Sequence, residues 1–402
     1  MSTDLIVIGG GAAGLTAAIR AAREGASVTV LEKNERPGRK LLASGNGKCN
    51  LTNLALQADR YGTDDPVLLA HCLQRFSPED AMAFFRDLGL EMKDRDGWVY
   101  PVTDQAASVL QVLLLEAERL RVRIKTREVV RQLQPPSAGE GDSLWTVRTS
   151  TWEYCAPAVL LACGSPASAV HGSSDDAWRI GNELGLRTEP FLPALVPLRI
   201  SRPLPAKWAS CRVHGRVRLY LDERFSGEEQ GELQLTDHGI SGIPVFQLSR
   251  RAVQAAADSR RVALELSFLP GLRTEEAAAL LRARREKWPG RTWPQLLTGL
   301  LPDRIITLVC AAMTEKAAPE EAARIITQLP LQIQGPASLT QAQICAGGIC
   351  LREMTENLAC RRLPGLFAAG EALNVAGPCG GYNLQWAWTS GMLSGAAAAG
   401  KE

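Results

Sequence analysis

The chain has 402 residues, of which 46% are hydrophobic and 22% are charged, a composition typical of globular proteins rather than disordered or fibrous ones. Its 45 basic and 43 acidic residues give a net charge of +2, so no overall field favours nucleic acid or an anionic membrane as a partner. A chain of this length is longer than one ordinary domain, so we predict two or three domains.

The N-terminal residues 1–4 lack the basic segment of a secretory signal, and no apolar run approaches the roughly 18 residues of a membrane span. We therefore expect a cytoplasmic protein without a membrane partner. The Ala- and Gly-rich stretch 391–400 is predicted to be a packed helix end. Ten cysteines include no C-x-x-C pair, which argues against a zinc ribbon or a redox-active disulfide, and we expect no metal site.

Residues 5–32 have the pattern of a nucleotide-binding unit made of strand, helix and strand. A short apolar strand leads into a G-x-G-x-x-G motif, in which Gly9 permits the tight turn, Gly11 lets the backbone approach a pyrophosphate and Gly14 lets the helix pack on the strand. The second strand ends at Glu32, an acid placed to accept hydrogen bonds from a ribose. This stretch predicts a dinucleotide site.

The next stretch, residues 33–53, is rich in Gly, Asn and Lys and has no helical or strand periodicity, which predicts a loop. Its four basic residues between Lys33 and Lys40 are suited to flank a pyrophosphate. Gly45 and Gly47, on either side of Asn46, would allow the backbone to approach a flat ring closely. A solvated surface loop is the alternative interpretation.

Helices and strands alternate between residues 77 and 164. Ser77 and Pro78 have the pattern of a helix start, and a second helix is expected from Thr103 to about residue 120. The strands predicted here are 122–133, 144–149 and 152–155, which form a meander, and 158–164, a buried parallel strand that ends in glycine.

Beyond Pro190 the chain changes character. Short alternating segments predict a small β-rich domain with strands at 195–200, 212–221, 231–235 and 262–268, followed by helices over 274–326. Arg282, Arg284 and Arg285 in this helical part are interpreted as a solvated helix face rather than a nucleic-acid surface, because no aromatic residues are interleaved to stack bases.

Near residue 344 the pattern of the nucleotide-binding domain returns. Residues 346–349 are predicted to form a tight turn, 366–371 a buried strand that ends in Gly and Glu371, and 380–385 the start of a helix. The carboxylate of Glu371 is suited to hold a ribityl hydroxyl, and the helix N-terminus to stabilise negative charge on a reduced ring. The nucleotide domain is therefore predicted to be discontinuous.

Together these segments resemble the BaiN-like and aminoacetone-oxidase-like FAD flavoproteins, bacterial oxidoreductases with a two-part FAD domain that carries an insert. The motifs that carry the resemblance are residues 9–14, 37–53, 100–106, 193–198, 236–242, 346–348, 370–371 and 380–388. The resemblance implies an α/β fold with a Rossmann-like FAD-binding domain in two parts, residues 1–190 and 344–402. We expect an inserted β-rich domain at 191–272 and 329–343, and a helical subdomain at 273–328.

The resemblance also implies which residues contact FAD, with Val129 near the adenine. The expected set is Gly9, Gly11, Ala12, Ala13, Gly14, Glu32, Lys33, Arg39, Lys40, Ser44, Gly45, Asn46, Val129, Cys163, Gly164, Gly370, Glu371, Gly381, Asn383 and Leu384. The chain departs from the family pattern in two places. Cys163 and its neighbours replace the usual Ala-Thr-Gly-Gly, and Asn374 and Ala376 replace two acids near the expected flavin edge.

Our leading functional interpretation is hydride transfer through flavin N5 to an activated carbon–carbon double bond in a hydrophobic small molecule, which the resemblance suggests is steroid-like. Only one G-x-G-x-x-G occurs, so the chain has no second module for a permanent nicotinamide site, and an NAD(P)H co-substrate would have to dock elsewhere and transiently. The candidate proton donors are Tyr382, Tyr100 and His238.

Two alternatives stay open at this stage. One is a flavin amine oxidase that uses O2, with Trp386 and Trp388 close to the flavin motif. The other is a non-enzymatic FAD protein that senses redox state or associates with RNA, although the near-neutral charge argues against a nucleic-acid partner.

Overall fold

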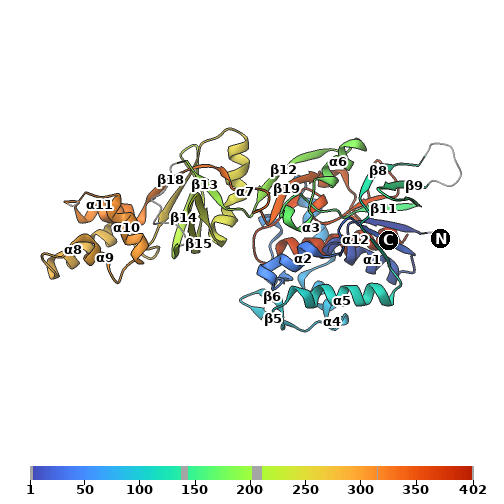
Figure 1. Ribbon diagram of the computed structural model, residues 1–402, viewed down its shortest axis with the longest axis horizontal. Coiled ribbons are helices and arrows are strands. Elements are labelled where there is room, and N and C mark those ends of the chain that lie inside the picture. The colour runs from blue at the N-terminus through green and yellow to red at the C-terminus, as the bar shows by residue number, and fades with distance from the viewer. Residues whose placement is uncertain (1–2, 137–143, 202–210, 315, 401–402) are drawn as a thin grey trace. The chain divides into compact units, whose positions relative to one another are not determined.

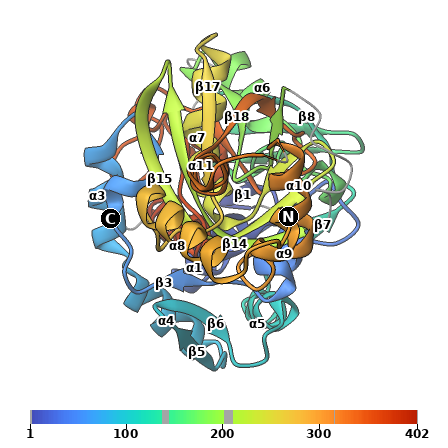
Figure 2. The same ribbon diagram turned by 90° about the vertical axis from the view of Figure 1, so that its left-hand side faces the viewer.

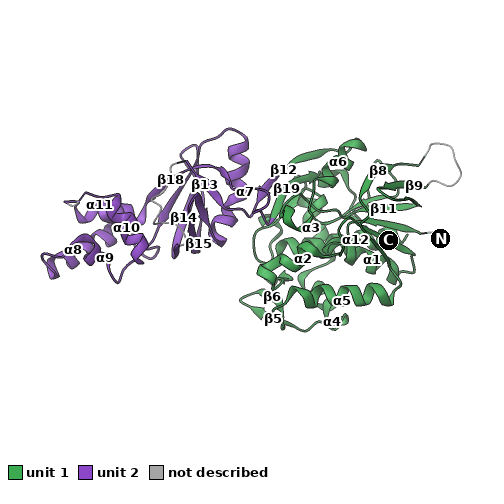
Figure 3. Ribbon diagram, viewed as in Figure 1, with its two compact units in different colours: residues 1–191, 344–402 green, residues 192–343 purple. Residues whose placement is uncertain are grey.

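The computed structural model describes residues 3–136, 144–201, 211–314 and 316–400. The chain divides into two compact units, which Figure 3 shows in different colours. Unit 1 comprises residues 1–191 and 344–402, and unit 2 comprises residues 192–343. Unit 1 is thus formed from both ends of the chain.

Unit 1 is built on a five-stranded sheet with the strand order β20–β11–β1–β2–β7, in which all neighbours are parallel. Figure 1 labels β11 of this sheet and the helices α1 and α12. Its strands are β1 (Leu5–Ile8), β2 (Val28–Glu32), β7 (Arg123–Thr126), β11 (Ala158–Leu161) and β20 (Leu366–Ala368). β1, β2, β11 and β20 are buried along their whole length, as expected for parallel strands covered on both faces. Because the strands are parallel, their carboxyl ends meet at one edge, where such sheets bind ligands.

Two helices, α1 (Ala12–Arg23) and α12 (Tyr382–Ala398), pack against each other at backbone distance. A Cβ atom at Gly391 would lie 2.6 Å from the carbonyl oxygen of Ala13, and one at Gly395 would lie 2.4 Å from that of Ala17. Because both contacts advance in the same direction along the two helices, α1 and α12 run parallel where they meet. The last helix of the chain is therefore fixed against the helix that follows the glycine motif.

The remaining elements of unit 1 surround this centre. The other helices are α2 (Arg39–Ala43), α3 (Pro66–Arg75), α4 (Pro78–Asp87), α5 (Ala106–Arg119) and α6 (Asp176–Glu183). The other strands are β3 (Thr52–Asn53), β4 (Gly62–Thr63), β5 (Met92–Arg95), β6 (Trp98–Pro101), β8 (Val130–Gln134), β9 (Trp145–Thr149), β10 (Glu153–Ala156), β12 (Thr188–Ala194), β19 (Ile344–Ile349) and β21 (Val375–Ala376). β8, β9 and β10 form the predicted meander.

The described residues of unit 2 form a closed six-stranded barrel and five α-helices, and the barrel strands β14, β15, β17 and β18 can be followed in Figure 2. The barrel strands are β13 (Leu198–Ile200), β14 (Cys211–Leu221), β15 (Arg224–Thr236), β16 (Gly239–Ser241), β17 (Val262–Ser267) and β18 (Leu329–Pro336). Helix α7 (Ile243–Ala257) lies on the barrel, and the helical lobe consists of α8 (Thr274–Lys287), α9 (Trp293–Leu297), α10 (Asp303–Ala311) and α11 (Pro319–Thr327). The predicted α/β class with a β-rich insert and a helical part is confirmed.

Several element predictions were wrong in detail. Residues 346–349 belong to strand β19 and not to a turn. Glycine is required there because a Cβ at Gly347 would lie 2.3 Å from the carbonyl oxygen of Pro190. The strand predicted at 122–133 is two strands, β7 and β8, in different sheets. Helix α5 begins at Ala106, because Asp104 has a φ of +53° and the backbone at Gln105 is extended.

The segment 33–53 is also more ordered than a loop. It contains the short helix α2 and the two-residue strand β3, and residues from Cys49 to Asn53 are buried. The sequence pattern missed this because the segment is held by distant partners. The Thr52 hydroxyl, for example, donates to Gln385 at 2.7 Å. Among the described residues, no helix is both long enough and apolar enough to cross a membrane.

The backbone contact between α1 and α12 predicts the effect of Gly395→Ala. Replacing glycine by alanine inside a helix normally stabilises it by about 1 kcal/mol. Here the added Cβ would overlap the Ala17 carbonyl, so we expect destabilisation by about 1–3 kcal/mol, measured by urea unfolding followed by tryptophan fluorescence. Gly271→Ala, in a turn where a Cβ meets open space, is the control for adding a methyl group without an overlap. Unchanged or higher stability of the Gly395 variant would contradict the packing described.

Candidate functional site

The carboxyl edge of the central sheet gathers four of the segments predicted to bind the cofactor. β1 is followed by Gly9, β2 ends at Glu32, β11 is followed by Cys163, and β20 is followed by Gly370. These positions come from distant parts of the chain, and the parallel register of the sheet brings them to one edge. The site therefore lies where open α/β sheets bind their ligands.

The three glycines of the motif have different surroundings. A Cβ at Gly9 would lie 2.4 Å from the Ala162 carbonyl oxygen, and one at Gly14 would lie 2.0 Å from the Gly9 carbonyl oxygen. These two glycines are required by the packing of the protein itself. A Cβ at Gly11 would meet no atom within 4 Å. Gly11 thus borders open space at the start of α1, which is the space a pyrophosphate needs.

The first turn of α1, which includes Ala12 and Ala13, carries no side-chain cap and no acidic residue. Its amide groups are therefore available to an anion, and the helix dipole favours negative charge there. Open space at Gly11 and an uncapped helix N-terminus together fit the pyrophosphate of FAD.

Glu32 is buried, with 7% of its surface exposed, and it organises the loop around it. Its carboxylate accepts hydrogen bonds from the amide of Gly10 at 2.9 Å and from the amide and side chain of Asn34 at 2.8 and 2.7 Å. A carboxylate has further acceptor positions, so these bonds leave capacity for a ribose hydroxyl. The Glu128 amide donates to the Glu32 carbonyl at 3.0 Å, which places its neighbour Val129 beside this acid.

The predicted basic residues find protein partners. Lys40 donates to both carboxylate oxygens of Glu371, at 3.0 and 2.7 Å, across 331 positions of sequence. Lys33 pairs with Asp176 at 3.2 Å. Arg39 donates to Asn34 and to the Val170 carbonyl, each at 3.2 Å. Lys40 is therefore the basic residue that joins the two halves of the site.

Glu371 is also bound by Ser165, whose hydroxyl donates to it at 2.5 Å. Ser165 was not predicted as a site residue. Its position shortly after a strand that ends at the ligand-binding edge of the sheet could have identified it. Gly164, with a φ of +73°, borders open space. Burial raises the pKa of the neighbouring Cys163 thiol to about 12, so this thiol stays protonated at neutral pH.

The segment predicted to face a flat ring has an unusual backbone. Gly45 and Asn46 have φ values of +56° and +54°, and a Cβ at Gly45 would lie 3.9 Å from the ring of Tyr100. Ser44 donates to the Leu41 carbonyl at 2.6 Å, which ties this segment to α2. The structure therefore places Tyr100 next to the glycine segment.

Helix α12 begins at the same edge. Its N-cap residue Gly381 is left-handed, and no side chain caps the helix. A Cβ at Gly381 would lie 2.5 Å from the Thr52 carbonyl, so only glycine allows this close approach. The Asn383 side chain accepts from the Gly377 amide at 2.8 Å and donates to the Gly377 carbonyl at 3.0 Å, while Leu384 packs in the adjoining core. The first-turn amides of α12 are a second anion-stabilising terminus.

Gly370 connects the two helices. Its amide donates to Ser390 at 2.8 Å, its carbonyl accepts from the Trp386 indole at 3.1 Å, and a Cβ on it would lie 2.9 Å from Ala13. It is therefore in contact with α12 and with the first turn of α1.

The three candidate proton donors lie in different surroundings. Tyr382 is 1% exposed, and its hydroxyl lies 3.4 Å from both the Gln57 amide and the Ala55 carbonyl. Tyr100 is half-buried, and burial raises the pKa of its phenol. His238 is exposed and belongs to unit 2, whereas Tyr382 and Tyr100 belong to unit 1. Their catalytic roles stay predictions.

The second departure from the family pattern, at Asn374 and Ala376, has structural reasons. Asn374 accepts from the Gly347 amide at 3.0 Å and donates to Asp64 at 3.2 Å, so an aspartate here would face a second carboxylate. Ala376 lies in β21 and is fully buried, where a carboxylate would lose its hydration. Both replacements fit their present neighbours.

Three comparisons with known proteins agree with this geometry. A family model described as the HI0933-like protein Rossmann domain matches residues 3–397. The 3-dehydro-bile acid delta(4,6)-reductase of Clostridium scindens is 37% identical over 98% of this chain and 98% of that protein. The ribosomal RNA dihydrouridine synthase of Escherichia coli is 26% identical over 96% of each chain.

Among solved structures, the 3-ketosteroid delta1-dehydrogenase of Sterolibacterium denitrificans aligns over 99% of both chains with a TM-score of 0.52. Its sequence identity to this chain is 13%, so the likeness concerns the fold alone. That fold is a Rossmann-like FAD-binding domain with an insert, as the sequence predicted.

The contacts of Glu32 predict that Glu32→Ala weakens FAD retention. The substitution removes the acceptor for the Gly10 amide and the expected ribose acceptor together. We expect the flavin-to-protein absorbance ratio after gel filtration to fall at least tenfold. Glu35→Ala, which breaks only an exposed pair with Arg127, should retain its flavin. Equal flavin content in both variants would rule out the role of Glu32.

Proposed function

The chain belongs to the HI0933-like family, and from this premise we propose that it reduces a carbon–carbon double bond conjugated to a carbonyl group. It is an oxidoreductase with a Rossmann-like FAD-binding domain. The observation that carries the proposal is the half-buried phenol of Tyr100 beside Gly45, at the edge where two uncapped helix N-termini fit the cofactor. This arrangement offers a proton source next to the expected ring.

The names of two relatives describe reactions of this class. A delta(4,6)-reductase of a 3-dehydro-bile acid removes double bonds conjugated to a ketone. A dihydrouridine synthase saturates the double bond of uracil, which is conjugated to a ring carbonyl. The two substrates differ greatly in size and polarity, so the shared feature is the electron-poor double bond.

The residues of unit 1 would hold FAD by their existing contacts. The first turn of α1 would bind the pyrophosphate, Glu32 a ribose hydroxyl and Glu371 a ribityl hydroxyl, while the first turn of α12 would stabilise negative charge on the ring. Bound FAD would supply the hydride for the reduction. Lys40 and Ser165 hold the Glu371 carboxylate in place.

Tyr100 would complete the reduction by giving its phenolic proton to the α-carbon. Its pKa is raised by burial, so the phenol is protonated at neutral pH and regains its proton from solvent after each turnover. In this proposal the two electrons come from NADH or NADPH. The single G-x-G-x-x-G motif provides no permanent nicotinamide site, so this co-substrate would bind transiently.

The substrate proposed first is a hydrophobic, steroid-like enone, in line with the relative of 37% identity. A uracil base in RNA is the second candidate, favoured by the dihydrouridine synthases of Escherichia coli and Haemophilus influenzae, which match 96% of this chain. The amine-oxidase alternative has lost its support, because Trp386 and Trp388 are 1% and 0% exposed and cannot line a pocket. We also propose that the enzyme is cytoplasmic, in line with cysteines that form no disulfide among the described residues.

Anaerobic stopped-flow spectroscopy tests the proposed electron source and acceptor. We expect NADH or NADPH to bleach the flavin absorbance, and a steroid 4-en-3-one or a uridine-containing RNA to restore it without oxygen. A primary amine should not bleach it. Bleaching by the amine, or failure of both conjugated acceptors to restore the absorbance, would contradict the proposal.

Tyr100→Phe tests the proton donor. Loss of a general acid typically costs a factor of about 10² to 10⁴, so reoxidation of the flavin by the substrate should slow at least 100-fold. Reduction of the flavin by NAD(P)H should keep its rate, since that step does not use the phenol. Tyr220→Phe on the barrel is the control. Unchanged reoxidation in the Tyr100 variant would exclude this role.

A further inference from the structure

The positive charge of the chain is concentrated in the inserted unit. Residues 192–343 contain 20 Lys and Arg against 15 Asp and Glu, whereas the rest of the chain contains 25 against 28. The nearly neutral net charge of the whole chain is therefore the sum of a basic unit 2 and an acidic unit 1. We expected no nucleic-acid partner because the net charge of the whole chain is nearly zero, and this argument does not apply to unit 2 alone.

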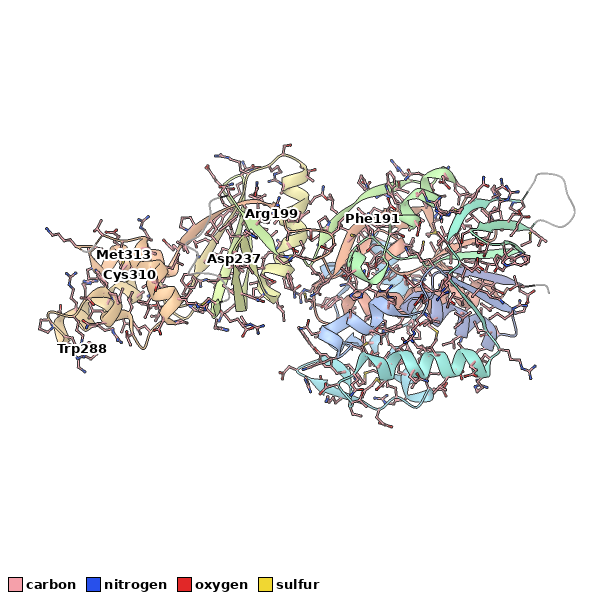
Figure 4. The ribbon with its side chains drawn as sticks, in the orientation of Figure 1. Phe191, Arg199, Asp237, Trp288, Cys310 and Met313 are labelled. Atoms are coloured by element: carbon pink, nitrogen blue, oxygen red, sulfur yellow. The ribbon has the colours of Figure 1, made fainter. Side chains whose placement is uncertain are left out.

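Within this unit, three cations surround one indole at the C-terminal end of α8. The charged groups of Arg284, Lys287 and Arg291 lie 5.2, 5.1 and 4.5 Å from the centre of the Trp288 ring. Figure 4 places Trp288 at the end of the helical lobe, away from Arg199 and Asp237 on the barrel. The sequence interpretation considered only aromatic residues interleaved among Arg282, Arg284 and Arg285, and Trp288 follows this run directly.

These three charges are not neutralised by the described part of the chain. The neighbouring Arg282 pairs with Glu320 at 3.2 Å, but no carboxylate among the described residues forms an ion pair with Arg284, Lys287 or Arg291. Arg284 donates to the Thr298 carbonyl at 2.9 Å, while its Nε is buried without a partner. The dipole of α8 accounts for cations in its last turn, but Arg291 lies beyond the helix end.

We propose that this cluster, Arg284, Lys287, Trp288 and Arg291, is a docking surface for the phosphate backbone of RNA. Guanidinium groups match phosphate oxygens in geometry, and stacking on an indole holds them in place before binding. A polyanion supplies the repeated negative charge that three clustered cations need. The indole face is already covered by cations, so the contact is to phosphates and carries no base sequence.

A membrane surface fits this cluster less well. Interfacial helices insert large apolar side chains beside their basic residues. Among the described residues of the helical lobe, from Thr274 to Thr327, no large hydrophobic side chain is exposed. The lobe therefore offers charge without an apolar anchor. Relatives named ribosomal RNA dihydrouridine synthases, which match nearly the whole chain, also favour RNA as the partner.

Fluorescence anisotropy tests the proposal with the FAD-loaded full chain and a fluorescein-labelled RNA hairpin that has uridines in its loop. We expect binding whose affinity falls steeply with KCl. The double variant Lys287→Ala/Arg291→Ala should bind about 100-fold more weakly, with a log–log salt slope smaller by about 2. The control Arg260→Ala/Arg261→Ala removes the same charge from the barrel and should bind like the wild type.

Equal binding by both double variants, or no binding by the wild type, would overturn the proposal. Vesicles of phosphatidylcholine and phosphatidylserine form a second arm, and binding to vesicles in preference to the RNA would also overturn it. The lobe variant should keep its flavin content and its reduction by NAD(P)H. A failure of RNA docking is thereby distinguished from a failure of the proposed reductase activity.

Discussion

The close contact between α1 and α12 is the constraint on which the rest of the structure depends. Gly391 and Gly395 let α12 approach the carbonyl groups of Ala13 and Ala17, closer than any side chain would permit. The helices run parallel, and Gly391, the residue of α12 beside Ala13, lies nine residues after the first residue of α12, Tyr382. The N-terminus of α12 therefore lies about 13 Å beyond Ala13 along the axis of α12. Two uncapped helix termini are thus held a fixed distance apart. A cofactor with phosphates at one end and a redox ring at the other suits such a pair.

Polar contacts across the same junction make the two halves one site. Lys40 from the first half binds Glu371 from the second, and the Trp388 indole donates to the Leu51 carbonyl at 2.9 Å. These bonds would not form if the ends of the chain folded as separate domains. The barrel and the helical lobe, within residues 192–343, contribute none of these bonds. A basic cluster on the lobe fits this division of roles.

The features that depend on residues close together in the sequence were predicted correctly. The glycine motif, the buried strands and the starts of α4 and α12 follow from short-range rules, and all are present. The features that were missed depend on contacts between distant residues. The glycines of β19 were interpreted as a turn, because only the approach of Pro190 shows why they are needed in a strand. The partners of Lys33 and Lys40, and the cations on Trp288, likewise appear only when distant or neighbouring side chains are placed in space.

The central claim is that one cofactor engages both helix termini at once. Hydrogen–deuterium exchange, read by mass spectrometry on flavin-free and FAD-loaded protein, tests it directly. The account predicts that FAD slows exchange at residues 11–15 and at residues 381–385 together, at the same FAD concentration. Protection of only one of these two segments, or of neither, would contradict a single site built from both ends of the chain.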